Sequence, residues 1–157
     1  MMDKLLKLLS KNAKLTNEEL AQTLGISLKE VEQKIEEYKQ EGIIRGYKVL
    51  LDYSRVETDY VMAFIELKVT PRATYGFDEI ARSIMQFPQV DSVYLLSGGY
   101  DLSVVVTAQS FKEICVFVSN CLSQMEGVIS TRTNFVLSKY LENGIVTCEP
   151  ATDERGQ

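Results

Sequence analysis

Helical patterns of apolar residues and helix-capping signals alternate along the first fifty residues. Over residues 5–9 leucines recur at helical spacing beside lysines, which predicts a helix that ends near Asn12. A second helix is expected to begin after Thr16, because Glu19 lies three residues later and completes a capping box. This helix should end at Gly25, since glycine readily adopts the left-handed conformation that terminates helices.

A third helix follows after a short break and repeats the capping box. Ser27 and Glu30 form the box, and the helix is expected to run to about Glu41 and to end at Gly42. Two helices so close together have no room to lie antiparallel, so they should cross steeply as a helix-turn-helix, although a corner used only for packing is an alternative. Residues 47–52 are predicted to be extended, as in winged modules. The buried stripe of the third helix is predicted to be Leu28, Val31, Ile35 and Tyr38.

Strand patterns replace helical ones after residue 59. Runs rich in β-branched and aromatic residues predict four strands, at residues 60–70, 91–97, 102–108 and 128–137. Apolar residues at helical spacing predict two helices, at residues 77–87 and 111–125. The second stripe is predicted to contain Phe111, Ile114, Val118, Leu122 and Met125. The order β-α-β-β-α-β predicts an α+β fold of the ferredoxin-like kind, with both helices on one face of an antiparallel sheet.

Both faces of the predicted sheet carry apolar residues. In the first strand, Met62 and Phe64 alternate with the apolar residues of the opposite face. The two helices can cover only one face, so we expect the other to be buried against a second copy of the chain. In the last strand, the residues predicted to alternate with the polar ones are Ile129, Thr131, Thr133, Phe135 and Leu137.

Charge divides the chain into two parts. The 157 residues carry a formal net charge of −5, and 45% of them are hydrophobic, which is typical of a globular protein. Residues 1–50 carry a formal net charge of +1, and the remaining residues carry −6. This asymmetry favours two modules, of which the N-terminal one would bind any polyanion. We expect modules at residues 1–50 and 60–138, a connector at 51–59 and a C-terminal tail at 139–157. No chemistry is assigned to the tail, where Cys148 is expected to be exposed.

The chain contains no histidine, which excludes most hydrolase designs, because neither a Ser-His nor a Cys-His pair can form. The 3 cysteines are widely spaced and favour free thiols over disulfides. We therefore expect no catalytic site, no metal site and no cofactor. No apolar run approaches the ~20 residues of a membrane-spanning helix, and no secretory signal is recognisable, so we expect a cytoplasmic protein without membrane contact.

Residues around the second and third helices resemble a known family. They are Leu20-Ala21, Leu24 to Ser27, Val31, Ile35 and above all Glu41 to Tyr47, which reads EGIIRGY. The chain resembles the Lrp/AsnC group of leucine-responsive and asparagine-sensing regulators over roughly residues 3–138. The resemblance implies a transcriptional regulator with a winged helix-turn-helix that binds double-stranded DNA. It also implies a ferredoxin-like RAM domain that binds an amino acid or related metabolite at subunit interfaces, and homodimers that build into oligomers such as octamers.

The outward side of the third helix is predicted to read DNA. A recognition helix places its N-terminal, solvent-facing residues in the major groove, where lysines can meet phosphate or guanine and Gln33 can pair with adenine. Between residues 28 and 41, however, three lysines face five glutamates, which lowers electrostatic affinity for DNA. A solvated charged helix face is therefore the alternative. The predicted DNA-binding residues are Ser27, Lys29, Gln33, Lys34 and Arg45.

The segment Ser97 to Asp101 is similar to the Gly-x-Tyr/Phe-Asp loop of the family. Gly98 and Gly99 are predicted to form a tight turn that lets backbone amides approach a carboxylate, and Asp101 can face a ligand ammonium. A glycine hairpin in which Asp101 caps its own turn is the alternative. Two threonines match a family Thr-x-Thr on the last strand, where hydroxyls lie near the effector. The predicted effector-binding residues are Ser97, Gly98, Gly99, Tyr100, Asp101, Thr131 and Thr133.

Two other functions compete with this interpretation. Some relatives of the family decarboxylate modified tetrapyrroles, but those enzymes rely on histidine, which this chain lacks. The remaining alternative is a metabolite-binding assembly protein with little specific affinity for DNA, which the acidic third helix suggests.

Overall fold

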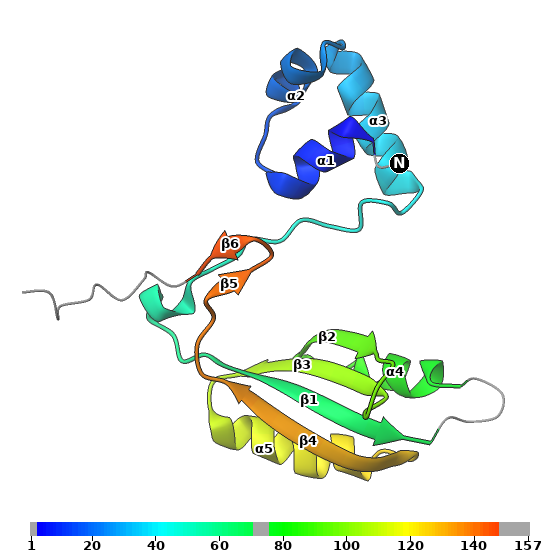
Figure 1. The fold of residues 1–157 in the computed structure, drawn as a ribbon, viewed down its shortest axis with the longest axis vertical. Helices are drawn as coiled ribbons and strands as arrows, with labels where there is room; N and C mark the ends of the chain where they lie inside the picture. Colours follow the sequence, from blue (N-terminus) through cyan, green and yellow to red (C-terminus); the bar gives the residue numbers. More distant parts are fainter. Residues whose placement is uncertain (1–2, 71–75, 148–157) are drawn as a thin grey trace, which may run out of the picture. The chain divides into compact units, whose positions relative to one another are not determined.

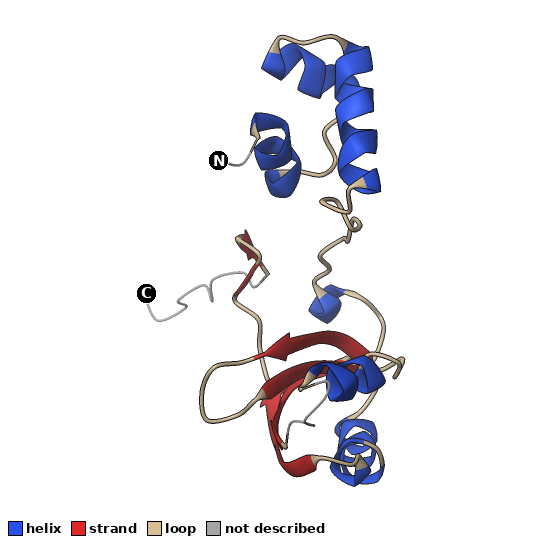
Figure 2. Ribbon diagram, turned by 90° about the vertical axis from the view of Figure 1, so that its right-hand side faces the viewer, coloured by secondary structure: helices blue, strands red, loops and turns tan. Residues whose placement is uncertain are grey.

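The computed structural model describes residues 3–70 and 76–147. The chain divides into two compact units, residues 1–50 and residues 51–157, each with its own hydrophobic core. The first unit is all helical, and the strands belong to the second (Figure 1; Figure 2). Among the described residues, no helix is long and apolar enough to span a membrane.

The first unit contains three helices: α1 (Lys4–Lys11), α2 (Asn17–Leu24) and α3 (Leu28–Gln40). Both predicted capping boxes are present. The hydroxyl of Thr16 accepts the amide of Glu19 at 3.2 Å, and the amide of Thr16 donates to Glu19 Oε2 at 2.8 Å. Ser27 and Glu30 make the same pair of bonds at the start of α3. Gly25 follows α2 with φ of +67°. These local bonds confirm the predicted helix boundaries.

The core of the first unit is small. Leu5, Leu20 and Val31 are buried, one from each helix, and partly buried apolar residues surround them. Leu28, predicted to be buried, is instead 40% exposed. It is the first residue of α3, one turn before Val31, so its side chain lies beyond the end of the helical core. Its predicted burial was wrong.

The segment after α3 is extended but unpaired. Residues 44–52 belong to no helix or strand, so the wing does not form a β-ladder within the described chain. A strand needs a hydrogen-bonded neighbour, and the sequence pattern alone does not supply one.

The second unit is built on a four-stranded antiparallel sheet. Its elements follow the predicted order: β1 (Val61–Val69), α4 (Asp78–Ile84), β2 (Val90–Leu95), β3 (Leu102–Ala108), α5 (Phe111–Asn120) and β4 (Val128–Val136). The strand order is β2-β3-β1-β4, with β1 and β3 in the centre. Single 3₁₀ turns precede β1 (Tyr53–Arg55) and follow α5 (Leu122–Gln124). The α+β, ferredoxin-like prediction is confirmed.

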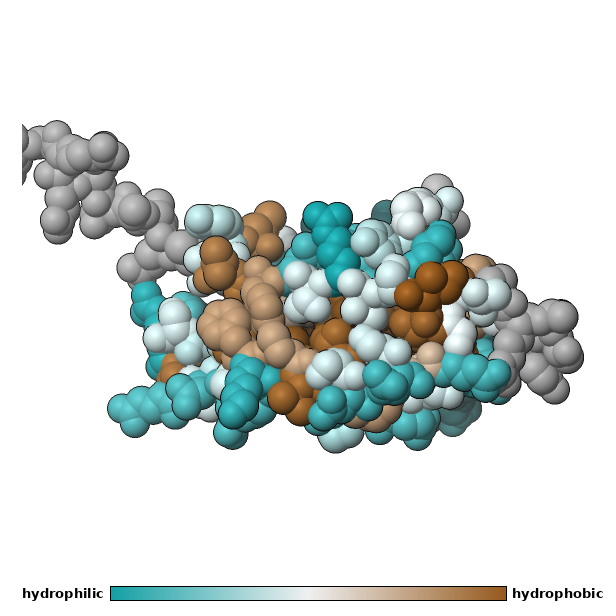
Figure 3. Space-filling model, turned by 90° about the horizontal axis from the view of Figure 1, so that it is seen from below, coloured by the Kyte–Doolittle hydropathy of each residue, from teal (hydrophilic) through white to brown (hydrophobic). Residues whose placement is uncertain are grey.

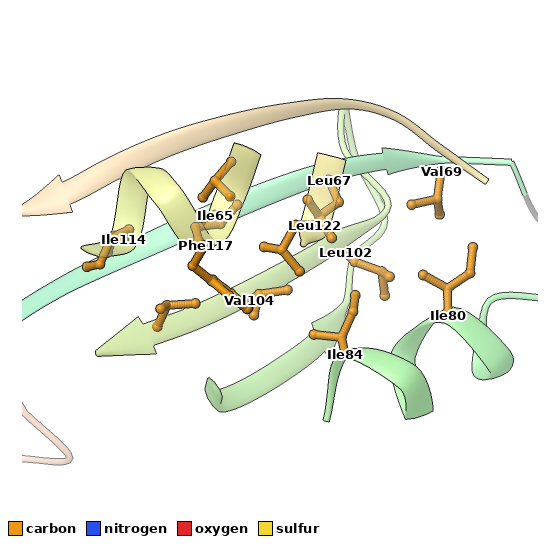
Figure 4. Close-up of a cluster of buried hydrophobic side chains, with 13 residues drawn as sticks. Ile65, Leu67, Val69, Ile80, Ile84, Leu102, Val104, Ile114, Phe117 and Leu122 are labelled. Atoms are coloured by element: carbon orange, nitrogen blue, oxygen red, sulfur yellow. The ribbon is translucent and has the colours of Figure 1, made fainter. Parts of the chain in front are cut away.

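Both helices pack on the same face of this sheet. Ile80 and Ile84 of α4 and Ile114 and Phe117 of α5 are buried against the strands (Figure 4). The strand residues that meet them are Ala63, Ile65, Leu67, Val69, Leu102, Val104 and Val106.

The other face of the sheet, here called the open face, has no helix on it. Met62, Phe64 and Lys68 of β1 alternate with the residues that meet the helices and point to this face, as do Ser103 and Val105 of β3; of these five, Phe64 is exposed and Lys68 is half-buried. Figure 3 views the molecule from below Figure 1, and the side that it shows carries hydrophobic patches among hydrophilic side chains.

The last strand differs from its prediction. A register shift lies between Lys68 and Val69, so that Lys68 pairs with Ser130 and Val69 with Val128. Ile129 therefore drops out of the ladder and is exposed, and Leu137, which lies beyond the strand, is 87% exposed. Both were predicted to continue the alternation of the strand. The bulge interrupts that alternation at Ile129, and the strand ends at Val136, one residue before Leu137.

Two short strands in the predicted tail were missed. Strands β5 (Leu141–Glu142) and β6 (Ile145–Val146) form a hairpin around Asn143 and Gly144, which have φ of 50° and 81°. Asn-Gly is a strong signal for such a two-residue turn, because both residues tolerate positive φ. Cys148 lies outside the described residues.

Candidate DNA-binding surface and effector loop

Ser27 and Lys29 stand at the start of α3, where a recognition helix would enter the groove. The hydroxyl of Ser27 donates to Glu30 Oε2 at 2.7 Å and accepts the amide of Glu30. The bonds from Ser27 lower the pKa of Glu30, since they stabilise its charged form. Lys29 is exposed and makes no hydrogen bond or ion pair with any described residue. The hydroxyl of Ser27 is thus engaged in the helix cap, whereas Lys29 has no partner among the described residues and is available to a ligand.

Gln33 and Lys34 both have acidic partners. Gln33 Nε2 donates to Glu37 Oε1 at 2.9 Å. Lys34 Nζ lies 3.4 Å from Asp3 Oδ2. Asp3 is the N-cap of α1, and its other oxygen accepts the amide of Leu5 at 2.7 Å. The Leu5 amide is the main cause that holds the pKa of Asp3 below its usual value. Two side chains that the sequence assigned to DNA are therefore engaged within the unit.

Arg45 lies just beyond α3 and covers a glycine. Gly42 has φ of +70°, and a Cβ built on it would stand 2.8 Å from the Cζ atom of Arg45. The guanidinium therefore lies across the backbone at this turn, although the residue as a whole is exposed. Further exposed cations come from α1 and the turn after it: Lys4, Lys7, Lys11 and Lys14.

The loop between β2 and β3, residues 97–100, is here called the effector loop. It is closed by a hydrogen bond from the amide of Leu96 to the carbonyl of Asp101 at 2.8 Å. Gly98 and Gly99 do not have positive φ, and a Cβ on either would meet nothing within 4 Å. The loop is therefore wider than the tight two-residue turn predicted from the sequence, which was wrong.

Asp101 is bonded to β1 and does not cap its own turn. Its Oδ2 accepts the amide of Val69 at 2.9 Å, and its Oδ1 lies 3.1 Å from Lys68 Nζ. Its own amide donates to the carbonyl of Leu67 at 3.0 Å. The Val69 amide is the main cause that lowers the pKa of Asp101. The alternative of a self-capping hairpin is therefore wrong.

The predicted effector residues do not gather at one point of a single protomer. Thr131 and Thr133 lie opposite Leu67 and Ile65, which are core residues, so both threonines lie on the helix-covered side of β4. Asp101 is joined to Lys68, whose side chain is on the open face. The loop residues Ser97, Gly98 and Gly99 are exposed, and Tyr100 is half-buried. The sheet thus separates Asp101 from the two threonines.

Lys68 is a residue that the sequence reading missed. Strand alternation predicted that it points away from the helices, but the pattern contained no sign that Asp101, 33 residues later, would pair with it. A lysine near the end of a predicted strand is common, so the sequence offered no usable signal.

A hollow of about 440 Å³ within the second unit was also missed. It lies between the connector, the start of β1 and the end of β4, and Leu51, Tyr53, Tyr60 and Lys139 are among its lining residues. The rings of Tyr53 and Tyr60 stack at 3.7 Å, and Lys139 Nζ stands 5.5 Å from the Tyr60 ring. Across residues 3–70 and 76–147, no cluster of potential ligands could hold a metal, and Cys115 and Cys121 are free thiols.

Comparison with known proteins places both units in one family. Residues 62–146 match the Lrp/AsnC ligand binding domain, and residues 4–45 match a winged helix-turn-helix DNA-binding domain. The chain belongs to the Lrp/AsnC family. It is 41% identical over 143 residues to the uncharacterized HTH-type transcriptional regulator YugG of Bacillus subtilis, and the match covers 90% of this chain and 86% of that protein.

Solved structures of Lrp/AsnC-type regulators share the fold. A transcriptional regulator of Neisseria meningitidis, crystallised as a complex with L-methionine, matches with a TM-score of 0.71 and 26% identity. The match covers 90% of this chain and 94% of that one. AsnC of E. coli matches with a TM-score of 0.68 and 24% identity, over 90% of this chain and 96% of the other.

This Lrp/AsnC protein is a transcriptional regulator with a helix-turn-helix and a ligand-binding domain, and it is not an enzyme.

Proposed function

We propose that this Lrp/AsnC regulator binds double-stranded DNA as a symmetric homo-oligomer in the cytoplasm. An amino acid or similar small metabolite, bound between subunits, changes its affinity for DNA. The observation that carries the proposal is that the predicted effector residues lie on opposite faces of one sheet, in a chain that also has a separate helix-turn-helix unit.

The DNA-binding step relies on few cations per protomer. Lys29 is available at the start of α3, while Gln33 and Lys34 already have acidic partners. The exposed lysines of α1 and Arg45 supply backbone contacts, because phosphate neutralisation needs charge near the groove and no particular geometry. An oligomer adds such weak contributions over several half-sites. Multimeric binding therefore compensates for the acidic surface of α3.

The assembly uses the open face of the sheet. Phe64 is exposed there, and Met62 and Val136 pair beside it. A second copy that packs its own open face on this one would remove the exposed ring of Phe64 from water, which favours a dimer. Dimers then associate into a larger ring such as an octamer.

The effector site lies where two subunits meet. One protomer offers the effector loop and Lys68 on one side and the β4 threonines on the other. The loop of one subunit and β4 of another can enclose a small ligand that neither encloses alone. The regulator from Neisseria meningitidis, whose solved structure is an L-methionine complex, supports an amino acid as the ligand class. Such a ligand changes DNA binding only by favouring one assembly over another.

Fluorescence anisotropy tests the part of the proposal that concerns DNA binding. The full chain is titrated onto labelled DNA from upstream of its own gene and onto a scrambled duplex, at two salt concentrations. We expect preference for the upstream DNA and steep weakening with salt. Lys29→Ala should weaken binding to both duplexes and reduce the salt slope by about one, whereas Lys112→Ala on α5 should change neither. Weak and equal binding to both duplexes would refute this part of the proposal.

The alternative function is a metabolite-binding assembly protein with little specific DNA affinity. The pairing of Lys34 with Asp3 and of Gln33 with Glu37 favours it, since both side chains would have to leave a partner to read a base. The DNA titration decides between the regulator and the assembly protein, because an assembly protein would bind the upstream and scrambled duplexes equally weakly.

A further inference from the structure

Asp101 and Lys68 form a pair at the base of the effector loop in which the cation is the more accessible member. Asp101 Oδ1 faces Lys68 Nζ at 3.1 Å and Oδ2 accepts the Val69 amide at 2.9 Å, so both carboxylate oxygens already have a donor. The side chain of Asp101 is 18% exposed and that of Lys68 is 42% exposed. A ligand that approaches this pair therefore meets the ammonium group first.

The effector loop ends at the residue before Asp101 and has four backbone amides without a described partner. The amides of residues 97–100 make no hydrogen bond with any described residue. Gly98 and Gly99 have neither positive φ nor a neighbour within 4 Å of an added Cβ. Nothing in the described chain thus requires glycine at either position, and the space above the backbone is open. Backbone amides without a partner can bind an anion, as can the ammonium of Lys68.

We propose that Lys68 binds the carboxylate of the effector, with help from the loop amides, and that Asp101 positions Lys68 and does not bind the effector's ammonium. This inference rests on the proposed effector function and narrows the ligand class to small carboxylates, with or without an amino group. Asp101 acts through its partners: it holds Lys68 by the ion pair and ties the loop to β1 through the Leu67 carbonyl.

Local charges support a carboxylate over an ammonium. Asp101 has one donor on each carboxylate oxygen, and an ammonium that bound it as well would stand close to the like charge of Lys68, whereas a carboxylate that binds Lys68 meets the opposite charge. Glu66, on the same face of β1, does not compete for Lys68, because its Oε2 lies 3.2 Å from Asn134 Nδ2 and 3.8 Å from Arg132 Nε. The ammonium of Lys68 keeps two N–H donors for the ligand.

The test is isothermal titration of the full chain with each proteinogenic L-amino acid. Every amino acid that binds is then compared with its α-amide and with its 2-oxo acid, which lack the carboxylate and the ammonium respectively. We expect the 2-oxo acid to bind and the amide to fail. Lys68→Met should raise the dissociation constant about tenfold or more, as expected for loss of a charge-assisted hydrogen bond, and Lys68→Arg should retain binding.

Lys112→Met, which removes an exposed lysine from α5, is the matched control and should bind as the wild type does. If Asp101 binds the ammonium instead, Lys68→Met frees its carboxylate and tightens binding, and the amide binds better than the 2-oxo acid. Either result overturns the inference. Thermal unfolding without ligand checks the fold of each variant, and Lys68→Gln serves as a second neutral variant.

The two levels of the proposal fail in different ways. If no amino acid, amide or 2-oxo acid binds the wild type, the proposed effector function is refuted, and the role of Lys68 with it. If amino acids bind the wild type and Lys68→Met equally well, only the role of Lys68 is refuted.

Discussion

Asp3 joins the start of α1 to the middle of α3 through an ion pair with Lys34. This pairing makes Lys34, a predicted DNA-binding residue, less available to DNA. One oxygen caps α1 through the amide of Leu5, and the other faces Lys34. Asp3→Asn keeps a capping side chain, because asparagine is as good an N-cap as aspartate, but removes the charge beside Lys34. We expect DNA binding a few-fold tighter at low salt and a salt slope steeper by about one, measured by anisotropy.

The control for this prediction is Glu57→Gln, which removes one exposed acidic charge from the second unit. An equal gain in both variants would show that net charge alone, and not the release of Lys34, sets the affinity.

Asp101 should make stability depend on pH in the acid range. The Val69 amide, opposed by burial and helped by Lys68, holds the pKa of Asp101 below its usual value. A lowered carboxyl pKa stabilises the fold fully above the unfolded pKa of about 3.9, and this stabilisation is lost as pH falls through the folded pKa. The melting temperature of Asp101→Asn should therefore lie below that of wild type at neutral pH, and the difference should shrink below about pH 4. Asp59→Asn, in the connector, should have the melting temperature of wild type at both pH values. If the difference in melting temperature between Asp101→Asn and wild type stayed constant with pH, the prediction would be contradicted.

At the scale of elements, the helical pattern over residues 111–125 correctly predicted that Ile114, Val118 and Leu122 are buried, but it was wrong about two phenylalanines. The predicted stripe began at Phe111, which is 52% exposed, and omitted Phe117, which is 4% exposed. Both rings make an edge contact, Phe111 with Phe135 at 4.9 Å and Phe117 with Phe87 at 5.1 Å. Spacing alone could not separate these two phenylalanines, because α4 and the turn after it decide which ring is covered.

This difference gives a matched pair of substitutions in one helix. Phe117→Ala should lower the free energy of unfolding by about 3–5 kcal/mol, because it leaves a cavity in the core. Phe111→Ala should lower the free energy of unfolding by about 1 kcal/mol, since about half of this residue is already exposed to water. Urea unfolding of the full chain measures both, and similar losses would show that Phe111 is buried in solution.

At the scale of the whole molecule, the open face should decide the oligomeric state. Phe64→Glu places a charge in the centre of the proposed dimer contact, where burial without a partner is costly. We expect the variant to be a monomer by light scattering at concentrations where wild type is a dimer or larger. Met85→Glu puts the same charge on an exposed apolar residue after α4 and should leave the assembly unchanged. An oligomer that persists in Phe64→Glu would place the contact elsewhere.

The sequence by itself determined the features that local interactions decide. Two capping boxes, each closed within four residues, gave the starts of α2 and α3, and Gly25 gave the break between them. Alternation and helical spacing predicted the β-α-β-β-α-β order, and motifs such as Glu41 to Tyr47 carried the resemblance to the family. The Asn143-Gly144 turn also belongs to this class, although the tail was assigned no structure.

Only the tertiary structure decided the features that depend on residues far apart in sequence. The bulge at Lys68 and Val69 set which residues of β4 face the helices, and it exposed Ile129. Asp3 paired with Lys34, and Asp101 with Lys68, across 31 and 33 residues. Both pairings change a predicted site. Asp3 engages Lys34, a predicted DNA-binding residue, and Asp101, a predicted effector-binding residue, is itself engaged by Lys68. Such pairings follow from strand register and helix packing, which a periodic pattern of apolar residues does not specify.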